Sequence, residues 1–477
     1  GSQAGDRRDN HPGRQRRADD FAPIGLDTPL RVLLATHSAA THASFGIVCR
    51  EIWTRLVAAD PTLEVVQHGW FHHPVAEGVP WEILPTECPT LEPGPDGRVP
   101  GIEDRYGDRS FRSVAAKVRP DVVWHLGDPY MGFETARAAS DLGFRLLYYY
   151  PVAREPFNHF RSEWVDKLAA ADLLVAATRY GSDILRAVPG LGDREIPHIH
   201  HGVDTRIFHP ERAERRAALR EEISAGLVGS DTFVLGWVGH DQFRKQVWVL
   251  FELLYHLRSG TYIRCRSCAR VTVREFDHLT RAPREAGRLR TYEPGYDYRR
   301  CWYCGSTNVT EGQPRNDVIL FTVMANNLEV GWDLRLLVDT FGLHDVVFDS
   351  SHARPEEGYT TADLAHIYNC FDTLVFPSGA EGFGMPVLEA MACGVPVVYG
   401  NYSAHAEFAV GRPVRVRLVP DVPDPSFLGF VDMGDLVANT LALIEDATLR
   451  RRLAARALAK ARTMDWDAFT PRWQELL

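Results

Sequence analysis

The 477-residue chain (53.6 kDa) is long enough for two or three domains that each bury a hydrophobic core. Apolar residues make up 45% and charged residues 24%, which is typical of a globular protein and excludes a collagen-like or wholly disordered chain. The net charge is −10, and no apolar run reaches the ~18–20 residues that cross a bilayer, so we expect no integral membrane association.

Residues 1–28 are polar and lack the apolar core of a secretory signal. We interpret them as a disordered lead-in whose first Gly-Ser is a remnant of cloning. From residue 29 to 212, apolar runs alternate with amphipathic stretches, such as the helices expected over 47–59 and 111–118. This alternation predicts parallel βαβ units and a first Rossmann-like domain. The expected strands are RVLLATH (31–37), TLEVVQHGWF (62–71), PDVVWHL (120–126), FRLLYYYP (144–151) and DLLVAAT (172–178).

A second series of apolar runs predicts a second Rossmann-like domain over residues 213–460. Ligands bind such sheets at the carboxyl ends of the strands, so we expect an α/β fold of two doubly wound domains facing a cleft. Residues 461–477 are helical, and we expect them to cross back to the first domain. The strands of the second series are TFVLGWVG (232–239), DVILFTVMA (317–325), DVVFDS (345–350), DTLVFPS (372–378) and GVPVVYG (394–400).

The second series is interrupted by residues 258–316, where a loop of ~2–6 residues is usual. This segment holds CRSC and CWYC, so that Cys265, Cys268, Cys301 and Cys304 form two C-x-x-C pairs. Four thiolates with this spacing predict a small zinc-ribbon-like module with a structural Zn²⁺, although the 32-residue gap exceeds the typical ~15–20. A redox pair or an iron–sulfur cluster is the alternative.

The other four cysteines are scattered in apolar surroundings and indicate buried thiols rather than a disulfide framework. We therefore expect a reducing cytoplasm as the location of the protein.

Charge is concentrated in the same insertion. Between Arg258 and Cys304 there are eleven arginines, no lysine and five acids, a net charge of +6 that leaves −16 for the rest of the chain. Arginines interleaved with aromatic side chains can contact phosphates and stack on bases, so DNA or RNA is a candidate partner. The alternatives are a solvated arginine-rich surface or a self-association patch. The sequence leaves the oligomeric state open.

Residues 377–400, PSGAEGFGMPVLEAMACGVPVVYG, predict a strand, a glycine loop and the start of a helix. The first amides of that helix, at Phe383, Gly384 and Met385, are expected to attract phosphate, because helix N-termini carry bare N–H groups and the positive dipole end. Glu381 and Glu389 flank this turn, with seven residues between them. Plain helix capping is the structural alternative.

This segment resembles the E-x7-E signature of retaining GT-B glycosyltransferases, the group related to glycogen synthase and sucrose synthase. HHGVDTRIFHP (200–210), GWVGHDQFRKQ (236–246), LAHIYNCFDTLVFPS (364–378) and MDWDAF (464–469) resemble further segments of that family. The resemblance implies a GT-B fold and transfer of a sugar, with retention, from a UDP- or GDP-linked donor to an acceptor hydroxyl. It also implies that no catalytic divalent metal is needed.

By this resemblance, Glu381 holds the hydroxyls of the transferred sugar and Glu389 holds the donor ribose. Lys245, with Arg244, neutralises the diphosphate leaving group. For Lys245, a solvated surface lysine is the alternative reading.

Further positions depart from the family pattern. Gly239 and His240 belong to the loop that approaches the donor, where His240 stands in place of the first family cation. Gly46 matches the glycine loop of the first domain, here as a single glycine. A family histidine is absent from YYYPVAREPF, so that its role is lost or passes to Tyr150, Arg154 or Glu155.

Three readings remain for function. One is a glycosyltransferase that acts on a hydroxylated base in nucleic acid. Another is a glycosyltransferase for a glycan, lipid or protein, with a purely structural zinc module. The third is an inactive nucleotide-sugar or nucleic-acid binding protein, against which the intact Glu381, Glu389 and Lys245 argue. His198, His200 and His201 lie in a family segment, which disfavours a metal site there.

Overall fold

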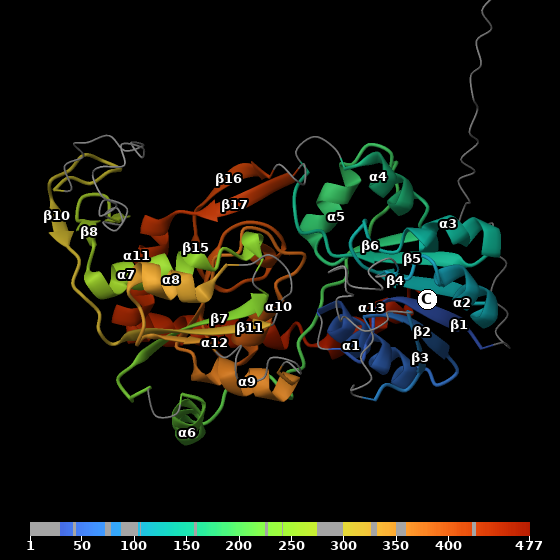
Figure 1. Cartoon of the computed structure of the whole chain (residues 1–477), viewed down its shortest axis with the longest axis horizontal. Helices are drawn as coiled ribbons and strands as arrows, with labels where there is room; N and C mark the ends of the chain where they lie inside the picture. Colours follow the sequence, from blue (N-terminus) through green and yellow to red (C-terminus); the bar gives the residue numbers. More distant parts are fainter. Residues whose placement is uncertain are drawn as a thin grey trace, which may run out of the picture.

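Two six-stranded parallel sheets form the framework of the protein, which was analysed as a computed structural model. The two α/β domains built on these sheets lie side by side (Figure 1). The structure describes residues 29–41, 44–71, 78–86, 104, 106–156, 160–224, 228–240, 242–273, 299–325, 332–349, 359–421 and 426–477. The expected lead-in at 1–28 lies outside the described residues.

The first sheet has the strand order β3-β2-β1-β4-β5-β6, with every neighbouring pair parallel. Its central strands are apolar and buried on both faces, because helices cover both sides of the sheet. The elements of this domain are β1 (Arg31–His37), α1 (Ser44–Ala59), β2 (Glu64–Trp70), β3 (Glu82–Pro85), α2 (Phe111–Val118), β4 (Val122–Leu126), α3 (Phe133–Leu142), β5 (Arg145–Tyr150), α4 (Ser162–Ala169), β6 (Leu173–Ala176) and α5 (Arg179–Arg186).

The second sheet has the order β12-β11-β7-β13-β14-β15, again with all neighbouring pairs parallel. A two-stranded antiparallel hairpin, β16–β17, extends from this domain. The elements are α6 (Ala213–Ile223), β7 (Phe233–His240), η3 (Phe243–Lys245), α7 (Trp248–Ser259), β11 (Val318–Ala325), α8 (Leu334–Phe341), β12 (Val347–Asp349), α9 (Thr361–Cys370), β13 (Thr373–Phe376), α10 (Met385–Ala392), β14 (Val397–Gly400), η6 (Ala404–Glu407), β15 (Gly411–Val414), β16 (Val416–Asp421), β17 (Ser426–Val431), α11 (Met433–Glu445) and α12 (Ala447–Arg462).

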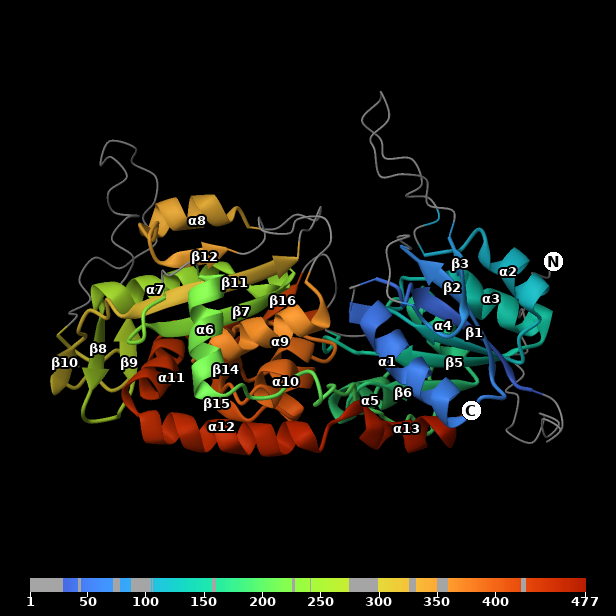
Figure 2. The same ribbon diagram turned by 90° about the horizontal axis from the view of Figure 1, so that it is seen from below.

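The last helix, α13 (Trp466–Gln474), belongs in space to the first domain. Figure 2 shows α12 running along the second domain and α13 continuing under the first. Trp473 is fully buried, with its ring centroid 6.0 Å from that of Trp124 on β4 and 4.8 Å from that of Tyr149 on β5. The C-terminus therefore completes the core of the domain in which the chain begins.

The interruption between α7 and β11 forms a three-stranded antiparallel sheet, β10-β8-β9, from β8 (Tyr262–Cys265), β9 (Val271–Val273) and β10 (Val309–Glu311). Tyr262 and Val271 are buried in the core of the second domain. Both ribbon views place these strands at the end of the second domain remote from the first (Figures 1 and 2). Residues 274–298, which include five of the eleven arginines, lie outside the described residues.

No helix in the described ranges is long and apolar enough to cross a membrane.

We predict that Trp473→Ala lowers the stability of the first domain by about 3–5 kcal/mol, the usual cost of removing a buried tryptophan side chain. Urea denaturation followed by circular dichroism measures this. Trp302→Ala is the control, because that side chain is 66% exposed and its removal should change stability by less than about 0.5 kcal/mol. Equal midpoints for the two variants would show that α13 does not support the first domain.

Candidate active site

A cleft of about 1380 Å³ opens between the two domains. Its walls carry residues that follow β4 and β5 in the first domain and β7 and β13 in the second, so it lies at the carboxyl edges of both sheets. This volume exceeds the ~300–1,000 Å³ of a pocket for one small ligand, and it offers space for two substrates at once.

The glycine loop after β13 forms the centre of the second-domain wall. Gly384 ends the loop with φ +98° and caps α10, whose N-terminus opens on the cleft. A Cβ atom on Gly384 would lie 2.7 Å from the Cβ of His405, and a Cβ on Gly382 would lie 2.7 Å from the carbonyl oxygen of Pro151 in the first domain. Only glycine therefore fits where the loop approaches its neighbours so closely.

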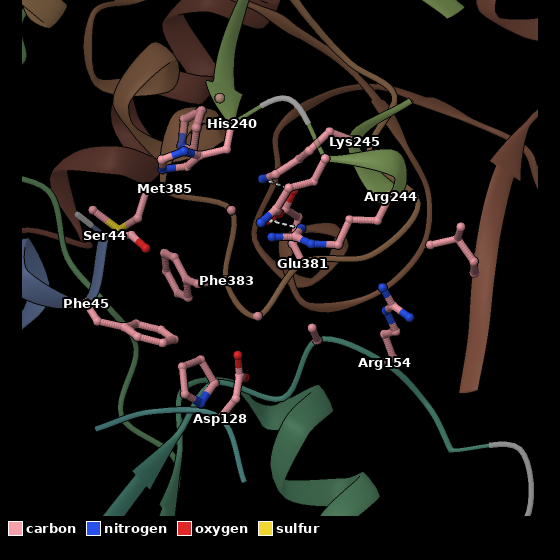
Figure 3. A pocket seen from close by; sticks show the side chains of 18 of the residues that line it. Ser44, Phe45, Asp128, Arg154, His240, Arg244, Lys245, Glu381, Phe383 and Met385 are labelled. Carbon is pink, nitrogen blue, oxygen red and sulfur yellow. Dashed lines mark hydrogen bonds and ion pairs between the residues drawn. The ribbon is translucent and has the colours of Figure 1, made fainter. Parts of the chain in front are cut away.

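Glu381 lies beside this loop with two cations. Its Oε1 is 2.5 Å from Nζ of Lys245, and its Oε2 is 3.1 Å from a guanidinium nitrogen of Arg244. The hydroxyl of Ser378 donates to Oε1 at 2.6 Å, and the amide of Glu381 donates to the hydroxyl of Ser403 at 2.9 Å. Figure 3 shows the two cations and the carboxylate converging on one side of the cleft.

The charges in this cluster support one another. Burial alone would raise the pKa of Glu381, but Lys245 and Arg244 outweigh it and bring that pKa to about 2. Burial lowers the pKa of Lys245 to about 8, although the Glu381 carboxylate opposes the shift. Glu381 and Lys245 are therefore both charged near neutral pH, and Lys245 and the Arg244 guanidinium present two cations to an anionic ligand.

Glu389, on α10, is buried and also lines the cleft. Burial raises the pKa of its carboxyl to about 7, against a hydrogen bond that the Tyr368 hydroxyl donates to Oε2 at 2.7 Å. Because Tyr368 lies on α9, this bond fixes the orientation of the carboxylate relative to a second helix.

Gly239 and His240, at the end of β7, line the cleft on the same second-domain wall as the glycine loop, which follows the neighbouring strand β13. Gly46 lies in the first turn of α1, and a Cβ there would be 2.4 Å from the carbonyl oxygen of Ser38 in the segment after β1. Its neighbours Phe45 and Ile47 line the cleft. The helix therefore approaches the segment after the first strand closely at this glycine, and the role of Gly46 toward a donor stays a prediction.

On the first-domain wall, Tyr150 and Arg154 line the cleft. Arg154 forms an ion pair with Asp421 of β16 across the domain boundary. The backbone carbonyl of Glu155 accepts a hydrogen bond from the Phe427 amide at 3.0 Å, so that residue joins the domains through its main chain.

Asp128 was not singled out from the sequence, yet its carboxylate points into the cleft from the segment after β4 (Figure 3). The available signal was its position in GDPY directly after an expected strand, because that edge of the sheet binds ligands.

His198 and His200 lie beside Glu407 of η6, with their ligand atoms within 4.8 Å of one another. Glu407 accepts hydrogen bonds from the amides of Arg179 and Tyr180 at 3.2 and 2.8 Å, and its carboxylate lies 2.7 Å from Nε2 of His200. These contacts join η6 to the start of α5, which is a structural role between the domains.

His201 is buried against the Phe383 ring, with a centroid separation of 4.7 Å.

The four cysteines of the insertion come together. The Sγ atoms of Cys265 and Cys304 are 3.6 Å apart, those of Cys268 and Cys301 are 3.5 Å apart, and all four lie within 4.8 Å of one another. A tetrahedral ion with bonds of about 2.3 Å separates its sulfur ligands by about 3.8 Å. The cluster therefore fits a tetrahedral metal ion.

Comparison with known proteins starts from the region around the glycine loop. Residues 358–411 match the family model of glycosyl transferases group 1. The O-antigen chain mannosyltransferase B of Escherichia coli is 38% identical over 108 residues, 23% of this chain and 25% of that protein. The D-inositol 3-phosphate glycosyltransferase 1 of Catenulispora acidiphila is 27% identical over 301 residues, 63% of this chain and 55% of that protein. The chain thus spans about a quarter to about half of the length of these curated relatives.

Solved structures extend the likeness to nearly the whole chain. HepE of Anabaena, in complex with UDP and glucose, superposes with a TM-score of 0.60 over 94% of this chain and 99% of its own, at 15% identity. Sucrose-phosphate synthase from Thermosynechococcus elongatus gives 0.62 over 94% and 97%, at 16% identity. The chain has the GT-B fold. The expected fold class is confirmed, including the cysteine cluster inserted in the second domain.

Proposed function

We propose that this GT-B protein is a retaining glycosyltransferase that uses a nucleoside diphosphate sugar. The observation that carries the proposal is the buried Lys245–Glu381–Arg244 cluster beside the N-terminus of α10, at the edge of an interdomain cleft. Two cations and a helix N-terminus suit a diphosphate, and a preorganised carboxylate suits sugar hydroxyls. The complexes of HepE with UDP and with UDP-glucose support a nucleotide-sugar donor for the same fold.

In this proposal, Lys245 turns from Glu381 toward the diphosphate while Arg244 stays beside Glu381, and the two cations neutralise the charge that develops as the diphosphate leaves. Glu381 then accepts hydrogen bonds from the transferred sugar, and Glu389 accepts them from the donor ribose. His240 and Gly239 bound the donor space from the end of β7. The retaining outcome rests on the E-x7-E resemblance, and the chemistry needs positioning and charge rather than a covalent step.

The first prediction for this site concerns the cluster. Glu381→Ala and Lys245→Ala should each lower kcat about 100-fold or more, the usual cost of one preorganised electrostatic group. Glu389→Ala should mainly raise the KM of the donor. A donor screen by thermal shift, followed by assays of donor hydrolysis, measures these effects. Glu221→Ala, on the exposed face of α6, is the matched control and should behave as wild type. Wild-type turnover by Lys245→Ala would remove that lysine from the mechanism.

The second prediction concerns pH. The ionised form of Glu389 accepts hydrogen bonds, and with a pKa of about 7 its ionised fraction falls about tenfold from pH 8 to pH 6. The KM of the donor should therefore rise by up to about tenfold over that interval. Above about pH 8 the KM of the donor should rise again, because Lys245 loses its proton and with it the positive charge that binds the diphosphate. Glu389→Gln should abolish the acid limb alone, and an unchanged acid limb in that variant would contradict the assignment.

We also propose that Cys265, Cys268, Cys301 and Cys304 hold one structural Zn²⁺, because four thiolates at these separations leave no position for a reactive water. Metal binding then supplies folding free energy to a module that has little core of its own.

The third prediction follows from this site. Purified protein should contain about one zinc per chain by elemental analysis. Cys301→Ser should lose the metal and lower the melting temperature, while Cys370→Ser, at a buried cysteine outside the cluster, should retain zinc. Iron in place of zinc, or a metal-free protein with an unchanged melting temperature, would reject this site.

A nucleic-acid acceptor depends on the arginine-rich insertion. Of the arginines in this insertion, Arg288 and Arg290 lie outside the described residues, and Arg299 and Arg300 lie in the described part. The described part lies at the end of the second domain remote from the first domain (Figure 1), whereas the cleft lies between the two domains. A cytoplasmic location stays a prediction from cysteine usage.

A further inference from the structure

The first-domain wall of the cleft combines aromatic rings with a carboxylate. Tyr130, which follows β4, is 45% exposed, and its ring centroid is 6.4 Å from that of Trp164 on α4. Phe45, at the start of α1, lines the same wall, and the Asp128 carboxylate points into the cleft (Figure 3). From this wall we infer that the acceptor is a neutral saccharide, an inference that rests on the glycosyltransferase function proposed above.

A pyranose ring matches this combination of groups. Its C–H face is apolar and packs on flat aromatic rings, which lose water-exposed area on contact. Its rim carries hydroxyl groups, and a carboxylate such as Asp128 accepts hydrogen bonds from hydroxyls with charge assistance. Tyr130 is 45% exposed and lines the cleft that also contains the proposed donor site, where a flat ring is open to contact with a second substrate.

The distribution of charge disfavours a polyanionic acceptor at this wall. Among the described residues, the charged side chains that line it are Asp128, Arg154 and Arg161. Arg154 is paired with Asp421, and the guanidinium of Arg161 lies 5.2 Å over the Trp164 ring. A carboxylate that faces a phosphate would repel it, whereas the paired cations of the cleft lie on the opposite wall. The wall therefore suits an uncharged acceptor.

The reaction balances without another reagent. A hydroxyl oxygen of the acceptor sugar bonds to the anomeric carbon of the donor as the bond from that carbon to the β-phosphate oxygen breaks. The hydroxyl proton passes to the departing diphosphate, so the products are a glycoside and a nucleoside diphosphate. Asp128 holds a neighbouring hydroxyl of the acceptor and takes no proton, and Tyr130 supports the ring.

The test compares sugar transfer to different acceptors. The donor in every assay is the nucleoside diphosphate sugar that the wild-type protein hydrolyses fastest. The acceptor probes are p-nitrophenyl hexopyranosides and a DNA duplex that contains 5-hydroxymethylcytosine. Transfer is measured by mass spectrometry of the acceptor. Hydrolysis is measured as the nucleoside diphosphate released when no acceptor is present. The variants are Asp128→Asn and Tyr130→Ala, with Tyr130→Phe as the conservative replacement. Asp166→Asn, exposed on α4, is the control.

We expect at least one hexopyranoside to accept sugar. Asp128→Asn and Tyr130→Ala should lower the ratio of transfer to hydrolysis on the order of tenfold, as in sites that lose a contact with a substrate group. Tyr130→Phe should restore most of that ratio because it keeps the aromatic face, and Asp166→Asn should match wild type.

Transfer to the duplex but to no hexopyranoside would overturn the saccharide assignment, as would wild-type ratios in both variants. Hydrolysis with no transfer to any hexopyranoside would also overturn it, while leaving the donor chemistry intact. Failure to hydrolyse or bind any nucleoside diphosphate sugar would instead reject the proposed function itself.

Discussion

The buried carboxylate of Glu381 has to be balanced by charge, and this requirement organises the second-domain wall. Isolated ionised carboxylates are strongly disfavoured in an interior, so Glu381 is stable there only with Lys245 and Arg244 beside it. Those cations lie on the turn after β7, and the carboxylate lies on the loop after β13, two strands that are neighbours in the sheet. The ionic contact thus ties two loops together at the point where a ligand enters.

Hydrogen bonds to main-chain carbonyls also hold these two loops together. The amide of Gly379 donates to the carbonyl of Arg244 at 2.7 Å, and the side chain of Arg244 donates to the carbonyl of Ala380 at 2.6 Å. The turn is therefore held in place by bonds that do not use the Nζ of Lys245. This leaves the lysine able to change partners from Glu381 to a phosphate without loosening the loop, which is what a preorganised anion site requires.

The sequence allowed the framework to be predicted because each central strand is an unbroken apolar run. The run 31–37 coincides with β1, and the amphipathic stretch 111–118 coincides with α2. Short or half-exposed strands carry weaker patterns, and β3 and the hairpin β16–β17 were not expected for that reason.

The second-domain site could also be predicted from the sequence, because glycines and glutamates have fixed spacing around a strand-to-helix turn. The residues of the first-domain wall could not be predicted in this way. Asp128 and Trp164 are separated by many residues in the sequence and lie on different elements, and only the fold brings both to one cleft.

The insertion enters the chain after α7 and leaves it before β11. In a parallel sheet, a helix-to-strand connection lies at the amino edge, and the strand-to-helix loops that contact ligands lie at the opposite edge. A segment inserted there can change its length or charge at its outer end without shifting the loops that line the cleft. Only its inner residues, such as Tyr262 and Val271, are constrained by the core of the second domain.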